Sequence, residues 1–291
     1  MSRIAYVNGR YVPHREAAVH VEDRGYQFAD GVYEVVCVHA GEIIDEDGHL
    51  DRLERSLGEL RIAPPMGRRA MKLVSRELIR RNGVKDGIVY TQITRGVARR
   101  DHPFPAAGTP PSIVMTSRRI KPQDPKVMRE GIAVISLPDI RWDRCDIKSV
   151  SLLPNVLAKQ QAREAGAYEA WFVDDDGNVT EGSSTNAWIV TADGKLVTRQ
   201  LSHAILGGIT RHSLIRLATE AQIKVEERPF SLEEARRARE AFLTSTTSFV
   251  IPIVALDGKP VGTGKPGPLA ARLRELYDGY METSVAAVEP A

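Results

Sequence analysis

The residue best suited to covalent chemistry in this 291-residue chain is Lys148, which lies in the run RWDRCDIKS (141–149). The nearby apolar residues Ile147, Val150, Leu152 and Leu153 predict a strand that enters the interior. Burial favours the uncharged form of a lysine amine, and this form attacks carbonyl carbons. Lys148 is therefore a candidate for Schiff-base chemistry. Taken alone the pattern is weak, because the chain holds 40 lysines and arginines, and most such residues are solvated.

A second candidate site is the start of a helix that periodicity predicts over 210–221. Gly207 and Gly208 precede it, and the free main-chain N–H groups of a helix N-terminus bind phosphate well. Without other signals, a glycine pair at this position is more often a plain helix cap.

Length and charge limit the class of protein. A chain of 291 residues suits two domains, and we expect a small N-terminal domain over 1–120, a linker over 121–127 and a large C-terminal domain over 128–291. Forty basic and 38 acidic residues give a net charge of +2 without a long block of one sign. This balance disfavours nucleic acid and membrane surfaces as partners and favours small-molecule chemistry.

The chain has no apolar run of the length that a signal peptide or a membrane helix needs, so we expect a cytoplasmic protein. Its two cysteines, Cys37 and Cys145, fit reduced thiols, and we expect no metal site.

Hydrophobic periodicity predicts a mixed α/β chain. In the first half we expect strands over 4–8, 11–13, 32–38, 43–44, 88–94 and 112–116, and helices over 49–61 and 69–82. In the second half we expect a strand over 132–137, an antiparallel meander over 168–173, 184–190 and 195–198, and helices over 155–166, 210–221, 232–239 and 269–281. The tail from Ser284 onward is expected to fray.

Seven stretches, in one order along the chain, resemble the fold-type IV pyridoxal-phosphate enzymes, and among them the D-amino-acid aminotransferases. They are EDRGYQFADGVYEVV, HLDRL, TRGVARRDHPFP, RWDRCDIKS, VTEGSSTN, GGITR and FLTSTTS. The resemblance implies a two-domain α/β (α+β) fold, with a smaller N-terminal α/β domain and a larger C-terminal domain whose antiparallel sheet is barrel-like. It also implies pyridoxal 5'-phosphate (PLP) as cofactor.

The resemblance assigns the cofactor's contacts. Lys148 holds PLP as an internal aldimine and, once substrate displaces it, moves the proton at the α-carbon. Glu181 faces the pyridine nitrogen and keeps it protonated; without the motif, it would be taken for a glutamate at the end of a turn. The remaining implied contacts bind the phosphate or lie along the ring: Arg52, Ile209, Thr210, Ser245 and Thr246, and Ser183, Ser184 and Leu206.

The resemblance places substrate choice in Tyr33, Arg100 and His102. It implies that Arg100 and His102 form a trap for the substrate carboxylate, that the other subunit of a homodimer donates these two residues, and that Tyr33 from the first domain completes the trap. Arginine suits this role because its planar fork meets a carboxylate with two bonds. Counting back from the histidine selects Arg100, with Arg99 as the alternative. Asp101 would weaken the trap if its carboxylate turned inward.

The implied reaction transfers amino groups from D-alanine or D-glutamate to 2-oxo acids such as 2-oxoglutarate. Sister enzymes of the same fold act on branched-chain L-amino acids, on (R)-amines or as aminodeoxychorismate lyases, and they share the cofactor motifs. Of the motif residues, only the Arg100 and His102 pair favours D-amino acids. A protein that binds PLP without turnover is an alternative of another class.

Overall fold

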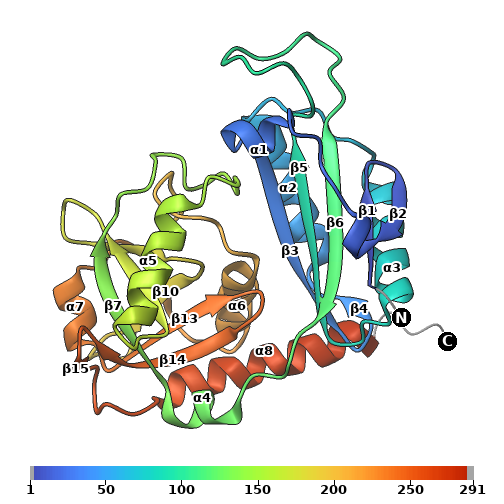
Figure 1. The fold of residues 1–291 in the computed structure, drawn as a ribbon. Helices are drawn as coiled ribbons and strands as arrows, with labels where there is room; N and C mark the ends of the chain where they lie inside the picture. Colours follow the sequence, from blue (N-terminus) through green and yellow to red (C-terminus); the bar gives the residue numbers. More distant parts are fainter. Residues whose placement is uncertain (1–2, 287–291) are drawn as a thin grey trace. The chain divides into compact units, whose positions relative to one another are not determined.

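The computed structural model describes residues 3–286, which form two compact units. The first unit contains the described residues up to Lys121, the short segment Ile147–Ser151 and residues 284–286; the second contains Pro122–Asp146 and Leu152–Thr283. Figure 1 shows both units. The segment 147–151, which carries Lys148, thus belongs to the first unit although both its neighbours in sequence belong to the second. No helix in residues 3–286 is long and apolar enough to cross a membrane.

A six-stranded sheet forms the first unit, in the order β2-β1-β6-β5-β3-β4. Its elements are β1 (Ile4–Val7), β2 (Arg10–Pro13), η1 (His14–Glu16), α1 (Arg24–Phe28), β3 (Gly31–His39), β4 (Glu42–Ile43), α2 (Glu46–Glu59), α3 (Arg68–Asn82), β5 (Gly87–Thr94) and β6 (Ser112–Arg119). Apolar residues of α2 and α3, such as Leu53, Leu57 and Leu78, pack with Val32 and Ile93 of the sheet into one core. Because side chains alternate along a strand, Tyr33 and Glu34 point to opposite faces of this sheet.

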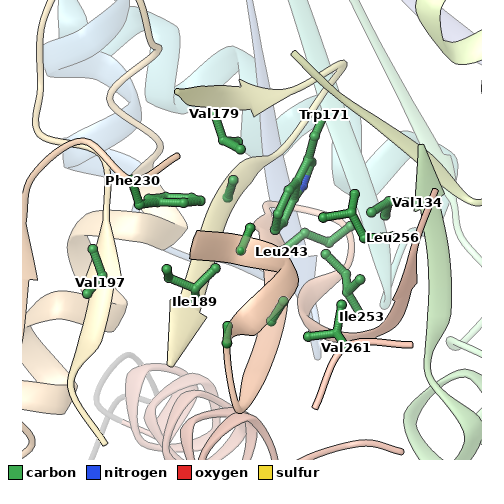
Figure 2. Packing of buried hydrophobic residues seen from close by; sticks show 14 of the residues in the cluster. Val134, Trp171, Val179, Ile189, Val197, Phe230, Leu243, Ile253, Leu256 and Val261 are labelled. Atoms are coloured by element: carbon green, nitrogen blue, oxygen red, sulfur yellow. The ribbon is translucent and has the colours of Figure 1, made fainter. Parts of the chain in front are cut away.

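The second unit is built on a nine-stranded sheet in the order β12-β11-β10-β13-β14-β7-β8-β9, with β15 paired to β14. Its elements are α4 (Pro125–Glu130), β7 (Ile132–Pro138), α5 (Leu153–Glu164), β8 (Glu169–Val173), β9 (Val179–Gly182), β10 (Asn186–Val190), β11 (Leu196–Thr198), α6 (Ile209–Glu220), β12 (Val225–Glu227), α7 (Leu232–Arg237), β13 (Glu240–Ser245), β14 (Phe249–Leu256), β15 (Lys259–Pro260) and α8 (Pro268–Ala286). Figure 2 shows its core, in which Trp171 and Phe230 meet edge to face among aliphatic side chains of several strands. The sheet curls, so that β9 at one end of the order lies beside β10 in its middle.

The predicted mixed α/β class is confirmed, but the second sheet is not wholly antiparallel. The pairs β8–β9, β10–β11, β10–β13 and β13–β14 are antiparallel, whereas β7–β8, β7–β14 and β11–β12 are parallel. Helix α5 connects β7 to β8 and helix α6 connects β11 to β12, and such helical crossovers bring consecutive strands back parallel. The predicted meander is therefore wrong, because β8 pairs with β7 and β9 and not with β10.

Several local predictions also differ from the structure. Helix α4 occupies part of the segment 121–127 expected as a linker, because Asp124 accepts the N–H of Lys126 and Pro125 fits the first helical turn. The predicted strand at Lys148 is instead an irregular segment with turns and one isolated bridge, Val32 to Ser149. The tail does not fray at residue 284, since α8 continues to Ala286; residues 287–291 of the predicted tail lie outside the described residues.

Candidate active site

The backbone of Lys148 is fixed against the first unit's sheet, while its side chain reaches an aromatic ring. Its carbonyl oxygen accepts the N–H of Tyr33 at 3.0 Å, and its own N–H donates to Ser56 Oγ of α2 at 3.2 Å. Lys148 is half-buried, and its Nζ lies 4.2 Å from the centre of the Tyr33 ring. Tyr33 in turn packs against Tyr90 of β5, with ring centroids 5.8 Å apart. The structure therefore brings together two of the predicted site residues, Lys148 and Tyr33.

Arg100 and His102 are exposed residues of the segment that joins β5 to β6, and they meet at the ring of Phe28. The guanidinium carbon of Arg100 lies 5.1 Å from the ring centroid of Phe28, and the His102 ring lies 5.5 Å from it. Asp101 turns its carboxylate to the backbone, where Oδ1 accepts the N–H of His102 at 2.8 Å. The carboxylate that would have weakened the trap is therefore engaged elsewhere.

Arg52 lies in a buried cluster on the helix-covered face of the same sheet. Its Nε and Nη2 donate to the two carboxylate oxygens of Glu34 at 2.7 and 2.8 Å, and His49 Nδ1 lies 2.8 Å from Glu34 Oε2. Burial alone would raise the pKa of Glu34, but the Arg52 guanidinium and the His49 ring lower it to about 2. Burial lowers the pKa of His49, against the pull of Glu34, so the ring favours its neutral form. The arginine predicted to bind phosphate is thus held in a fixed orientation by a carboxylate.

The lowered pKa of Glu34 predicts an acid-sensitive part of the stability. Because the folded-state pKa of about 2 lies below the ordinary 4.5, this stabilisation is fully present above about pH 4.5 and is lost as the pH falls toward 2. The shift corresponds to a pH-dependent contribution of Glu34 to the free energy of unfolding on the order of 3 kcal/mol. In calorimetric unfolding between pH 7 and pH 3, the stability difference between the wild type and Glu34→Gln should shrink as the pH falls.

A matched control is Glu77, whose pKa is also lowered to about 2, by Arg80 and Arg81 on the surface of α3. Solvent and salt screen an exposed pair, so Glu77→Gln should remove little acid-sensitive stability in about 0.15 M salt. A constant difference between the wild type and Glu34→Gln across the pH range would contradict the assignment.

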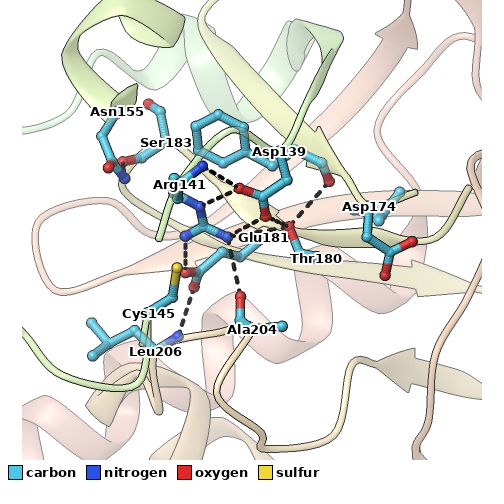
Figure 3. A network of polar contacts seen from close by, with 12 residues as sticks. Asp139, Arg141, Cys145, Asn155, Asp174, Thr180, Glu181, Ser183, Ala204 and Leu206 are labelled. Atoms are coloured by element: carbon cyan, nitrogen blue, oxygen red, sulfur yellow. Dashed lines mark hydrogen bonds and ion pairs between the residues drawn. The ribbon is translucent and has the colours of Figure 1, made fainter. Parts of the chain in front are cut away.

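Glu181 lies in the second unit, where its carboxylate is buried at the centre of a polar network (Figure 3). Arg141 Nη1 donates to Oε1, while Oε2 accepts the main-chain N–H of Leu206 and the side-chain amide of Asn186, each at 3.1 Å. Burial raises the pKa of Glu181, and Arg141 opposes that rise. A buried carboxylate with a raised pKa gains from a second cation and can share a proton with a basic ring nitrogen.

Arg141 is itself almost completely buried and is held by a second carboxylate. Its Nε and Nη2 donate to the two oxygens of Asp139 at 2.9 and 2.7 Å, and Nη2 also reaches the carbonyl oxygen of Ala204 at 3.1 Å. The guanidinium lies 4.5 Å from the ring centroid of Phe172. Burial opposes its charge, yet Asp139 and Glu181 raise the pKa of Arg141, so it stays cationic. Asp139 and Arg141 therefore fix the position of the Glu181 carboxylate.

Asn186 links Glu181 to the start of helix α6. Its side-chain amide donates to the carbonyl oxygen of Leu206 at 2.9 Å as well as to Glu181. A Cβ atom on Gly208 would lie 2.0 Å from Asn186 Oδ1, so this close approach requires glycine at 208. Ile209 and Thr210, the first two residues of α6, are buried, and the N-cap residue Gly208 has no side chain that could cap the helix. The first N–H groups of a helix have no partner inside it, so this end suits an anion.

The serines of the VTEGSSTN run converge on Glu169, a fully buried carboxylate of β8. Ser183 Oγ donates to its Oε1, and Ser184 Oγ donates to its Oε2 at 3.2 Å. Ser245 is the last residue of β13, and Thr246 opens the turn that leads to β14; both are half-buried. Ser245 Oγ accepts the N–H of Ser248 at 3.2 Å, which shapes this turn.

Sequence reasoning assigned no role to several residues that build these sites. The signal that could have identified them is a polar residue beside or within an apolar run, as at Arg141, Asp139, Asn186, Glu169 and Glu34. Their partners lie in other parts of the chain, however, and the sequence does not indicate which partner each one meets.

The groups that these residues offer fit pyridoxal phosphate. A half-buried lysine amine suits the aldehyde carbon, the buried Glu181 carboxylate suits a protonated ring nitrogen, and the N-terminus of α6 suits a phosphate. The close packing of Gly208 on Asn186 joins the last two groups within the second unit.

Most of the chain matches known proteins in sequence. Residues 31–256 match the family model for amino-transferase class IV. A D-alanine aminotransferase from Bacillus licheniformis is 41% identical over 267 residues, which cover 92% of this chain and 93% of the relative. A D-alanine aminotransferase from Staphylococcus aureus (strain MSSA476) is 38% identical, with 96% and 98% covered.

The fold of the chain also matches that of solved structures. The structure of a branched-chain amino acid aminotransferase from T.th. with pyridoxamine 5'-phosphate matches with a TM-score of 0.87 and 27% identity, and the match covers 95% of this chain and 93% of that one. The chain therefore belongs to the class IV aminotransferases, enzymes that transfer amino groups with pyridoxal 5'-phosphate as their cofactor.

Proposed function

We propose that this enzyme transfers amino groups from D-amino acids, such as D-alanine and D-glutamate, to 2-oxo acids such as 2-oxoglutarate. The observation that carries the choice of substrate is the joint placement of Arg100 and His102 on the Phe28 ring, which gives a cationic fork and an imidazole on one small surface. The relatives named D-alanine aminotransferase, 37–41% identical over most of the chain, support the same choice.

In this proposal Lys148 attaches the cofactor and then acts as the base that moves the proton at the substrate's α-carbon. The bound cofactor supplies an electron-accepting ring. Glu181, fixed by Arg141, holds a proton at the ring nitrogen, and Asn186 keeps the carboxylate in line with the start of α6. Lys148 can move without disturbing its backbone, because its anchoring bonds to Tyr33 and Ser56 use main-chain atoms.

The remaining cofactor-binding residues bind the phosphate or lie along the ring in this proposal. Arg52 and the main-chain N–H groups at the start of α6 bind the phosphate, together with the side chain of Thr210 in α6 and those of Ser245 and Thr246 at the β13–β14 turn. Leu206 supports one face of the ring, Ser183 and Ser184 lie along it, and Ile209 contributes its backbone. Glu34 assists by holding the guanidinium of Arg52 in one orientation.

The carboxylate trap predicts a selective loss when Arg100 is replaced by alanine. Because a charge-assisted bidentate contact is removed, KM for D-alanine should rise about 10- to 100-fold. The half-reaction with (R)-1-phenylethylamine, which has no carboxylate, should change little. Half-reactions followed by cofactor absorbance measure both effects. Arg99→Ala is the matched control, and equal losses with both substrates would contradict the trap.

We also propose a homodimer in which each subunit gives Arg100 and His102 to the site of its partner, and a cytoplasmic location. Apolar side chains at helical spacing on α5, Leu153, Val156 and Leu157, are 68%, 59% and 49% exposed, and such a stripe favours burial against another subunit. Mixing Lys148→Ala with Arg100→Ala chains would then rebuild one intact site in each mixed dimer. With D-alanine below the wild-type KM, random association would restore about a quarter of wild-type activity; no recovery would contradict the exchange.

A further inference from the structure

The end of helix α1 forms a platform for the two trap residues. Phe28, the last residue of the helix, contacts the His102 ring at a centroid distance of 5.5 Å and an interplanar angle of 48°. The guanidinium carbon of Arg100 lies 5.1 Å from the centroid of the same Phe28 ring, within the range of a cation–π interaction. A single aromatic side chain therefore contacts both residues that the proposed function gives to the substrate carboxylate.

The first residue of α1 holds the backbone of the same segment. Arg24 is 4% exposed, and its Nη1 and Nη2 donate to the carbonyl oxygens of Asp101 and His102 at 2.6 and 3.3 Å. Its Nε donates to Asp30 at 2.8 Å, and its guanidinium carbon lies 4.8 Å from the Phe28 ring centroid. The buried arginine thus joins the trap segment to the helix that carries the platform.

Asp30 connects this arrangement to the rest of the first unit. In addition to the hydrogen bond from Arg24, Asp30 accepts two hydrogen bonds from Arg95, at 2.7 and 2.9 Å. Arg95 also donates to the carbonyl oxygens of Leu60 and Arg61. Burial would raise the pKa of Asp30, but the two guanidinium groups keep it below its ordinary value. Asp30 therefore stays ionised, and its charge holds both arginines where they bind backbone oxygens.

These contacts matter because the side chains of the trap residues are exposed in the single chain. Arginine side chains carry much rotamer freedom, and ordering them costs free energy when substrate binds. A bidentate contact also needs the guanidinium plane in one orientation. A ring that contacts Arg100 and His102 before substrate arrives reduces both costs, and the bonds of Arg24 keep their backbone at a fixed distance from the ring.

We propose that Phe28 and Arg24 are positioning residues that set the affinity of this enzyme for the substrate carboxylate, Phe28 by orienting Arg100 and His102 and Arg24 by anchoring their backbone. This inference rests on the proposed function, in which Arg100 and His102 bind the carboxylate. Neither Phe28 nor Arg24 is required to touch substrate.

The test compares Phe28→Leu, which keeps an apolar side chain but removes the ring, with Phe28→Tyr, which keeps the ring. KM and kcat for D-alanine are measured on the holoenzyme, together with inhibition by propionate, a carboxylate without an amino group. Phe28→Leu should raise KM and the propionate inhibition constant roughly fivefold, the scale of one cation–π contact, with kcat within about twofold. Phe28→Tyr should resemble the wild type.

Phe104→Leu is the matched control. Phe104 lies in the same segment but packs on Arg95 and Arg61, at 3.7 and 4.7 Å from its ring centroid. If Phe28→Leu changes KM no more than Phe104→Leu while Arg100→Ala raises it, the positioning role is wrong and the proposed function stands. If Arg100→Ala also leaves KM unchanged, the positioning role and the proposed function are both wrong. Loss of kcat and thermal midpoint without a change in KM would mark Phe28 as merely structural and overturn the inference.

Discussion

Replacing Lys148 by alanine is expected to abolish amino-group transfer, because alanine has neither an amine to attach the cofactor nor a base to move the α-proton. Loss of a general base alone costs about 10²- to 10⁴-fold, and loss of the attachment adds to it. The fold should survive, since the hydrogen bonds of Lys148 to Tyr33 and Ser56 use main-chain atoms. Single-turnover reactions with D-alanine, followed by absorbance, measure the effect.

The matched control for this variant is Lys126→Ala. Lys126 is an exposed lysine of α4 whose side chain pairs only weakly with Glu130, at 3.6 Å. Its loss should leave the rate unchanged, because an exposed pair one helical turn apart contributes little. A Lys148→Ala rate within tenfold of the wild type, in the absence of added amines, would contradict the role of Lys148.

Replacing Arg141 by methionine is expected to cause the largest loss of stability. The change leaves the buried carboxylates of Asp139 and Glu181 without their shared cation, and breaking a buried pair in this way costs about 3–5 kcal/mol. The three tryptophans of the chain, Trp142, Trp171 and Trp188, all lie in the second unit. Denaturant unfolding followed by tryptophan fluorescence therefore reports on the unit that contains Arg141.

Two further variants separate the charge effect from simple loss of a side chain. Arg237→Met removes an exposed arginine of the same unit, paired with Glu233 at 3.5 Å, and should cost less than about 1 kcal/mol. Adding Asp139→Asn and Glu181→Gln to Arg141→Met removes the stranded charges, so part of the lost stability should return. If Arg141→Met is no less stable than Arg237→Met, the network does not hold the fold as described.

Local patterns predicted much of the fold. Helix α3 begins within one residue of the predicted position and ends as predicted, because its apolar residues follow helical spacing and Gly83 adopts the left-handed conformation that ends a helix. The hairpin of β1 and β2 follows from its asparagine and glycine turn. Helix α1 was not predicted, although Asp23 caps it; five residues are too few for periodicity to appear.

Long-range pairing could not be predicted from these patterns. Strands β13 and β14 lie at the centre of the second sheet, but their apolar run fits either a buried strand or a buried helix. The sequence around Arg141 indicates two nearby acidic residues, but not that the guanidinium would reach Glu181, 40 residues away. Likewise, Arg24 and His102 meet across 78 residues, a contact that depends on how β3 and β5 pair.

The central claim is that this enzyme takes its amino group from D-amino acids. It is tested most directly by adding D-alanine, L-leucine and (R)-1-phenylethylamine separately to the purified holoenzyme and following the absorbance of the lysine-bound cofactor at about 410 nm. Rapid loss of the band with D-alanine, and not with the other two, is the predicted result. Loss with L-leucine or the amine, and not with D-alanine, would contradict it.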